Sequence, residues 1–159
     1  RNQLFYSHNF GHKTATSFHG LGINGKLSEL QGAMGLTVLP YMDTILNGRK
    51  NIVEFYNSNL DFSKVQKLKI RDNTQWNYSY YPILFETEEI LLKVQNALNE
   101  QHIFPRRYFY PSLNTVDYIK GVSMPVSENV ASRILCLPLN AELSESDVKK
   151  IVNILNSNV

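Results

Sequence analysis

Residues 22–36, with the sequence GINGKLSELQGAMGL, decide the fold. Their second half predicts a helix that begins at Ser28, because Gln31 stands three residues later and completes a capping box. In that motif the serine oxygen accepts a backbone N–H and the glutamine side chain reaches back to the serine N–H. Asn24 lies just ahead of this helix among glycines, where amide and backbone donors can approach an anion closely. The residues therefore indicate a turn and a helix start suited to an anion.

A longer helix follows the first. Apolar side chains of the first helix share one face, and its small residues allow a second backbone to approach. These residues are Leu27, Leu30, Met34 and Val38 on the face, and Gly32, Ala33 and Gly35 among the small ones. Pro40 ends this helix or lies in the first turn of the next. The second helix extends to about Leu60, with a periodic buried stripe and with Gly48 as a point of close packing. The stripe consists of Met42, Ile45, Leu46, Arg49, Ile52, Val53 and Tyr56.

The first 25 residues are polar and rich in glycine, and they predict a long loop without helix or strand. Loops of this length are usually functional or disordered. Three histidines fall in it, His8, His12 and His19, but their spacing matches no standard zinc pattern. We expect surface histidines, with a position at a ligand pocket as the alternative, and no metal site.

Beyond residue 62 short strands and helices alternate in the order β–β–α–β–α–β–α. Strands are predicted over 65–70, 78–85, 106–110 and 134–139, and helices from Thr87, over 127–133 and from Ser144. Pro82 lacks a backbone N–H, so its strand is expected at an edge or with a bulge. This order predicts a small α+β domain with helices on one face of a short sheet.

Composition sets further limits. The chain has 159 residues, 43% of them hydrophobic and 19% charged, which fits about one folded domain and excludes a disordered tail. A net charge of +2 is too small to indicate a nucleic-acid binder. The longest weakly polar stretch, 32–42, is far short of the ~20 residues of a membrane span. We therefore expect a cytoplasmic protein.

Two other features have structural and functional interpretations. The single cysteine, Cys136, excludes an internal disulfide, and its apolar strand predicts a buried hydrophobic residue rather than a nucleophile.

Residues 106–110 (RRYFY) combine cationic and aromatic side chains, a pattern that can bind RNA. A strand with one buried face explains that pattern equally well, and the glycine-aromatic signature of RNA-recognition modules is absent.

The same segments together resemble the sugar aminotransferases that use pyridoxal phosphate and act on nucleotide-linked keto sugars, the DegT/DnrJ/EryC/StrS family. The resemblance covers essentially the whole chain and is most specific over 22–36. The matching residues there are Gly22, Asn24, Lys26, Leu27, Ser28, Glu29, Gln31, Ala33 and Gly35. Elsewhere they are Asn9 to Gly11, Arg49, Lys50, Tyr56, Arg107 to Pro111, Cys136 to Leu139, Leu143, Ser144, Asp147 and Val148.

The resemblance implies an α/β fold like that of aspartate aminotransferase, fold type I, with a large cofactor domain before a small one. Residues 1–60 would be the active-site loop and connecting helices from the end of the large domain, and 61–159 the small C-terminal α+β domain. The large N-terminal domain, with its Schiff-base lysine, would precede Arg1, which is not a methionine. Residues 17–20 look like the family's lysine segment, but Gly22 stands where that lysine would be. We therefore expect no catalytic residue in this chain.

Four residues receive roles from the resemblance. Asn24 matches the asparagine that reaches across a homodimer interface to the cofactor phosphate of the other subunit. Lys26 stands where arginine is common, and it keeps the charge but lacks the planar fork. Tyr110 lies in the segment near the sugar nucleotide. Asn114 stands where a histidine often occurs.

The expected function is the C-terminal part of an aminotransferase that moves an amino group from an amino acid, glutamate, to a nucleotide-linked keto-deoxy sugar. Residues 9–26 look like the subgroup that aminates C4, and the product is expected to serve surface polysaccharide or amino-sugar biosynthesis. The fragment alone is expected to be inactive. The alternative is a non-catalytic dimerisation remnant, in which the helix after Ser28 forms a protein interface. No nucleic-acid or membrane partner is expected.

Overall fold

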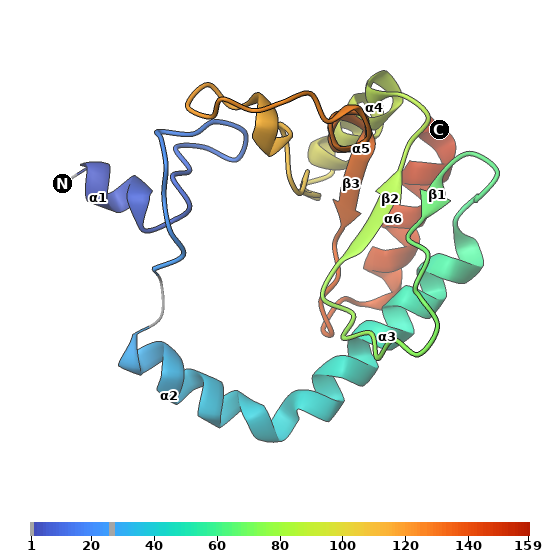
Figure 1. The fold of residues 1–159 in the computed structure, drawn as a ribbon. Coiled ribbons are helices and arrows are strands. Elements are labelled where there is room, and N and C mark those ends of the chain that lie inside the picture. The colour runs from blue at the N-terminus through green and yellow to red at the C-terminus, as the bar shows by residue number, and fades with distance from the viewer. Residues whose placement is uncertain (1, 26–27) are drawn as a thin grey trace.

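The computed structural model describes residues 2–25 and 28–159, and Figure 1 shows their arrangement. The helices are α1 (Asn2–Ser7), α2 (Glu29–Val38), α3 (Met42–Asn59), α4 (Glu88–Glu100), α5 (Pro125–Arg133) and α6 (Glu145–Asn158). Two short 3₁₀ turns are η1 (Leu39–Tyr41) and η2 (Leu113–Thr115). The strands are β1 (Gln66–Lys67), β2 (Tyr81–Leu84) and β3 (Ile134–Leu137). Among these elements none is a helix long and apolar enough to cross a membrane.

A small antiparallel sheet and three helices form the core. The strands lie in the order β1–β2–β3, and β2 pairs with β3 from Tyr81 opposite Leu137 to Leu84 opposite Ile134. Alternate residues of β2 and β3 meet the apolar faces of α3, α4 and α6, and Figure 1 shows α6 lying against the sheet. The buried side chains include Ile83, Leu135, Tyr56, Leu91, Val94, Leu98, Ile151 and Leu155. The predicted mixed α+β fold is confirmed.

Three helix starts follow the local signals in the sequence. Ser28 accepts the N–H of Gln31, and the Gln31 side chain accepts the Ser28 N–H, so the predicted capping box is present. Thr87 caps α4, and Ser144 caps α6. Each cap satisfies a backbone donor that has no partner inside its helix. These helix boundaries are therefore set by neighbouring residues.

The prediction that Pro82 lies in an edge strand or at a bulge is wrong, because β2 is the central strand and its register with β3 runs without a bulge from Tyr81 to Leu84. The missing N–H of Pro82 leaves no neighbouring backbone acceptor without its hydrogen bond, for two reasons. β1 pairs only with Ile83 and Leu84, so the strand has no β1 partner at Pro82. On the other side, Cys136 uses its N–H and its carbonyl for Arg106, at 2.8 and 3.2 Å, and needs no donor from Pro82. Pro82 thus occupies a position in the strand where no backbone N–H is needed to pair with a neighbouring strand.

Two further strand predictions need correction. The strand expected over 65–70 is reduced to the two residues of β1, and the one over 106–110 is a single bridge between Arg106 and Cys136. The first 25 residues also differ from the predicted loop, because α1 occupies their start. Short sequence stretches do not reveal these differences, since the partner strands come from distant parts of the chain.

Helix α2 forms at the predicted place, but every residue of it is exposed. Leu30, Met34 and Val38 on its predicted apolar face are 72%, 59% and 42% exposed, and Leu27, the fourth residue of that face, lies outside the described residues. The predicted stripe of α3 is buried only in its second half, at Ile52, Val53 and Tyr56. Gly48 packs as predicted, since a Cβ there would lie 2.8 Å from that of Ala141. No described residue buries the apolar face of α2.

Candidate functional site

Asn24 lies in a folded-back pair of segments rather than in a free loop. Its backbone bridges to Asn9, and the Gly25 N–H donates to the His8 carbonyl at 3.0 Å. The Ile23 N–H also donates to the Ser7 carbonyl, at the end of α1. The Asn24 residue is exposed, and its side chain has no hydrogen-bond partner within 2–25 and 28–159. The backbone is therefore fixed while the amide side chain is open to a ligand.

Gly22 occupies the tightest point of this pair of segments. A Cβ there would clash with the backbone of Phe10 and Gly11, so any side chain would push the two segments apart. Gly11 opposite it has a φ of 79°, in the left-handed region that favours glycine. In this structure, position 22 has no room for a lysine.

The three N-terminal histidines contact aromatic rings. His12 stacks on Phe18 with 4.6 Å between centroids, and His19 lies 5.0 Å from the ring of Tyr6. The Nδ1 of His8 lies 2.9 Å from the Leu4 carbonyl oxygen. The part of the chain that the structure describes contains no group of three or more His, Cys, Asp or Glu placed to hold a metal. His8 and His19 are exposed, as expected for surface histidines, and His12 is half-buried.

Tyr110 is half-buried, and its ring lies under the guanidinium of Arg107 at 3.6 Å from the centroid. Arg107 also donates to Glu88 at 2.7 Å and to the Ser132 carbonyl at 2.8 Å, and its side chain is only 9% exposed. Arg106 is exposed and donates to the Tyr108 hydroxyl at 2.9 Å. Only one arginine of the predicted pair therefore faces solvent, which weakens the RNA interpretation.

Asn114 has all its polar groups engaged inside the chain. Its Oδ1 accepts the Ser112 hydroxyl at 2.7 Å, and its Nδ2 donates to the Val122 carbonyl at 3.0 Å and to Glu128 at 2.6 Å. Hydrogen bonds from the Met124 N–H and from Asn114 hold the pKa of Glu128 below its usual range. Asn114 thus stabilises the segment between η2 and α5. To bind a ligand, its side chain would have to give up one of these hydrogen bonds.

The candidate residues come from two neighbouring parts of the fold. The N-terminal segment lies beside the segment that links η2 to α5, where Phe18 and Tyr118 meet edge to face at 6.0 Å (Figure 1). No hydrogen bond joins Asn24 to Tyr110 or to Asn114 in the described parts of the chain. Lys26 lies outside the described residues. The Arg107–Glu88 pair was missed from the sequence, since 19 residues separate its members and no local pattern links them.

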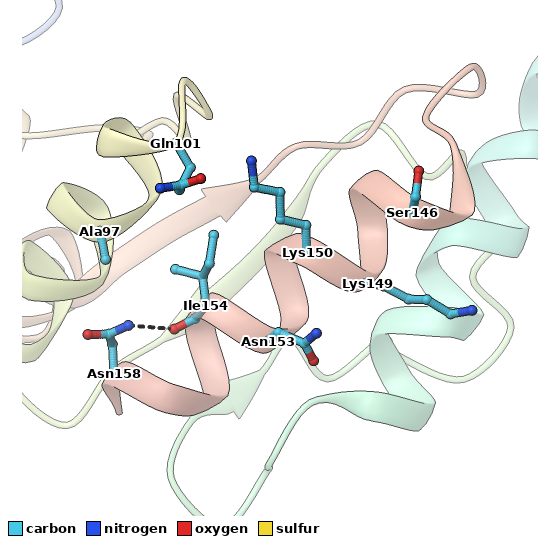
Figure 2. A pocket seen from close by; sticks show the side chains of 8 residues that line it. All are labelled: Ala97, Gln101, Ser146, Lys149, Lys150, Asn153, Ile154 and Asn158. Atoms are coloured by element: carbon cyan, nitrogen blue, oxygen red, sulfur yellow. Dashed lines mark hydrogen bonds between the residues drawn. The ribbon is translucent and has the colours of Figure 1, made fainter.

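Neither of two hollows on the surface of the described residues is lined by Asn24, Tyr110 or Asn114. One of about 520 Å³ lies between α4 and α6, where Lys150 and Gln101 point across it (Figure 2). Lys149 on its rim pairs with Glu145. The other, of about 270 Å³, is lined by Trp76 and by Tyr81, whose hydroxyl donates to Asn57 at 2.9 Å. The candidate residues therefore lie outside both hollows.

Cys136 is buried, as predicted, and burial raises the pKa of its thiol to about 11. At pH 8.5 the native protein should react with iodoacetamide about 100-fold more slowly than the urea-unfolded chain, because so little thiolate forms.

The raised pKa of the Cys136 thiol also means that the folded state holds this proton more tightly than the unfolded state. Its contribution to stability is complete below about pH 8.5 and is lost as pH rises through about 11.

Mass spectrometry of quenched samples measures this rate at a single site, because the chain has one cysteine. A native rate equal to the unfolded rate would contradict the burial of Cys136. Urea titrations at pH 8 and pH 10.5 test the linkage, and the midpoint is expected to fall at the higher pH. Burial also raises the pKa of Tyr81 from 10.0 to about 12, so a loss in the same direction begins near pH 10 and already contributes at pH 10.5.

Comparison with known proteins gives the family. The model of the DegT/DnrJ/EryC1/StrS aminotransferase family matches residues 2–156. The chain belongs to this family. The match includes Asn24, Tyr110 and Asn114, so the segments that resemble the family lie inside it.

Relatives with a named activity agree with the family. The chain is 38% identical over 152 residues to a dTDP-4-amino-4,6-dideoxy-D-glucose transaminase of Shigella dysenteriae, covering 91% of this chain and 41% of the relative. It is 32% identical to an enzyme of the same name from Escherichia coli, over 92% of this chain and 42% of the relative. The chain thus spans about two fifths of the length of these relatives.

Solved structures support the fold. A DegT/DnrJ/EryC1/StrS aminotransferase from Brucella abortus superposes with a TM-score of 0.72 at 26% identity, over 98% of this chain and 42% of that one. The aminotransferase TlmJ from Streptoalloteichus hindustanus superposes with a TM-score of 0.75 at 20% identity, over 89% of this chain and 39% of that one. The helices and small sheet described above therefore form part of the larger aminotransferase fold.

Proposed function

We propose that this chain is the C-terminal part of an aminotransferase that transfers an amino group from glutamate to C4 of a nucleotide-linked keto-deoxy sugar. The observation that carries the proposal is the match to one aminotransferase family over residues 2–156. Relatives at 38% and 32% identity named for a dTDP-4-amino-4,6-dideoxy-D-glucose product favour C4 and a dTDP sugar. Surface polysaccharide synthesis is the expected use of the product. The cytoplasmic location stays a prediction.

The proposed protein has two domains and forms a homodimer. Residues 1–60 would belong to the end of the large cofactor domain and its connecting helices, and residues 61–159 would form the small domain. The hydrophobic core joins the second half of α3 to β2, α4, β3 and α6, so the folded unit of the small domain also takes in part of the connecting helix before residue 60. The exposed apolar face of α2 supports a further partner surface, from the rest of the enzyme or from the second subunit.

The residues present fit part of a pyridoxal phosphate site. When bound, the cofactor supplies the group that accepts and releases the amino group and delocalises the charge that develops on the substrate carbon. Asn24 is exposed on a fixed backbone, and its amide can donate to the cofactor phosphate of the partner subunit. Lys26 is proposed to add a positive charge beside it. The lysine that holds the cofactor is proposed to lie in the large domain, which fits the lack of room at Gly22.

Tyr110 is proposed to contact the sugar nucleotide. Its hydroxyl has no hydrogen-bond partner among the described residues, while its ring is held by Arg107. Asn114 is proposed to act on the same site through the segment that it fastens to Glu128. This chain would therefore contribute binding and orientation, and the chemical step would need the rest of the enzyme.

The function is tested with the full-length protein. It is incubated with glutamate and a dTDP-linked 4-keto-6-deoxyglucose, and mass spectrometry detects the aminated sugar nucleotide. The 3-keto isomer and a GDP-linked 4-keto sugar are the matched alternatives, and we expect much slower turnover of both. The 159-residue chain alone is expected to give no product. Product from the 3-keto isomer alone would overturn the assignment to C4, and no product from any of these sugars would overturn the proposed function.

The role of Asn24 gives a separate prediction. In the full-length protein, Asn24→Ala is expected to weaken cofactor binding about tenfold, because one charge-assisted hydrogen bond to the phosphate is lost. Dialysis against increasing cofactor, followed by absorbance, measures the affinity. Asn153→Ala, on the exposed face of α6, is the control and should leave the affinity unchanged. An unchanged affinity in the Asn24 variant would remove this residue from the site.

A further inference from the structure

Arg107 forms hydrogen bonds with two helices, and its guanidinium also packs on Tyr110, a residue of the proposed site. Its Nη2 lies 2.7 Å from the Glu88 carboxylate in the first turn of α4 and 2.8 Å from the Ser132 carbonyl near the end of α5. The guanidinium carbon lies 3.6 Å from the centroid of the Tyr110 ring. Only 9% of the Arg107 side chain is exposed, whereas 38% of the Glu88 side chain is exposed. The guanidinium is therefore largely buried and pairs with a carboxylate at the surface of the domain.

We infer that Arg107 is a positioning residue that sets the orientation of Tyr110 toward the nucleotide sugar, an inference that rests on the proposed function. Tyr110 lies in a segment without regular structure, and no hydrogen bond to its hydroxyl fixes the ring within the described residues. The flat guanidinium against the ring face limits its rotation, and α4 and α5 hold that guanidinium in place. The position of the Tyr110 hydroxyl thus depends on where α4 and α5 lie.

The geometry of the contact requires an arginine. A guanidinium can donate in its plane to Glu88 and Ser132 while its face packs on a ring. A lysine ammonium is a compact charge that can replace the ion pair but not the flat stacking surface. Arg107→Lys should therefore keep the charge in place and release the ring. This separates the positioning role from simple charge compensation.

A second arginine provides a matched control. Arg133 donates to the carbonyls of Phe85 at 2.6 Å and Glu86 at 3.2 Å and to the Asn129 side chain at 2.6 Å. It joins α5 to the end of β2, and among the described residues it has no hydrogen bond to Tyr110 and does not lie over the Tyr110 ring. Arg133→Lys should therefore disturb the domain in a similar way without moving the Tyr110 ring.

The test uses the full-length enzyme and measures the two half-reactions separately. In the first, glutamate alone converts the cofactor, which absorbance follows without any sugar. In the second, the aminated enzyme is mixed with the keto sugar nucleotide. Arg107→Lys should raise the KM of the second half-reaction about tenfold and leave the first within about twofold. Arg133→Lys should change neither, and Glu88→Gln should change the second in the same direction as Arg107→Lys but less.

A double-mutant cycle with Tyr110→Leu completes the test. If Arg107 acts through the ring, the double variant should be no worse than Tyr110→Leu alone. Additive effects, or an equal loss in both half-reactions, would overturn the inference while the proposed function stands. An unchanged KM in Tyr110→Leu would remove Tyr110 from the proposed site and overturn the inference with it. A wild-type protein without transamination of any nucleotide sugar would overturn both.

Discussion

Replacing Tyr56 by alanine is expected to lower the free energy of unfolding by about 3–5 kcal/mol, the usual cost of deleting a buried aromatic side chain. Tyr56 lies on α3 and is fully buried. Its ring packs against that of Tyr81 on β2 at 4.9 Å between centroids, and its hydroxyl donates to the Pro138 carbonyl at 2.8 Å. The side chain therefore joins α3 to the central strand and to the residue that follows β3.

Two control variants separate the ring from the hydroxyl and from general effects. Tyr56→Phe keeps the ring and loses only the hydrogen bond to Pro138, so its cost should be about 1 kcal/mol. Tyr41→Ala removes a ring that is 65% exposed in η1, and its effect should stay within about 0.5 kcal/mol. Urea unfolding of the 159-residue chain measures all three. A loss below 1 kcal/mol for Tyr56→Ala would show that α3 does not share the core.

The outcome of the sequence predictions depends on the distance over which each feature is decided. The starts of α2, α4 and α6 follow from Ser28, Thr87 and Ser144, because a cap and the donor that it satisfies are three residues apart. The place of Pro82 in the central strand depends on Arg106, which takes both backbone groups of Cys136. Nothing near Pro82 in sequence could indicate this.

In the candidate site, too, some features depend on neighbouring residues and others on residues far apart in the sequence. Motifs in the sequence place Asn24 before a helix and Tyr110 in an aromatic segment, and both expectations concern neighbouring residues. The stacking of Arg107 on Tyr110 and its pairing with Glu88 depend on how α4 meets the segment after it. The bonds of Asn114 to Val122 and Glu128 likewise appear only when the chain folds back on itself. The sequence therefore supplies candidate residues, and only the fold shows how each of them is held.

Helix α2 leads to the second large prediction, because its composition conflicts with its surroundings. Glu29 is the one charged residue among the ten of α2, yet all ten are exposed. Leu30 and Met34 lie on the same face, one turn apart. A helix this apolar is usually buried, and a contiguous exposed apolar patch usually marks an interaction site. We proposed above that the rest of the full-length enzyme or its second subunit covers this face.

The double variant Leu30→Asp, Met34→Asp is therefore expected to act differently in the two forms of the protein. In the 159-residue chain both positions are exposed, at 72% and 59%, so the melting temperature should change by less than about 2 °C. In the full-length enzyme each aspartate would be a buried charge without a partner, which costs several kcal/mol, and the folded dimer should be lost.

Light scattering after size exclusion measures the dimer, and calorimetry measures the melting temperature of both forms. Leu30→Ala with Met34→Ala is the matched variant, which removes apolar area without adding charge, and it should weaken the dimer rather than abolish it. A full-length aspartate variant that remains a dimer with an unchanged melting temperature would mean that α2 stays exposed in the whole enzyme. The apolar face would then need a different partner, since burial within the enzyme would no longer account for it.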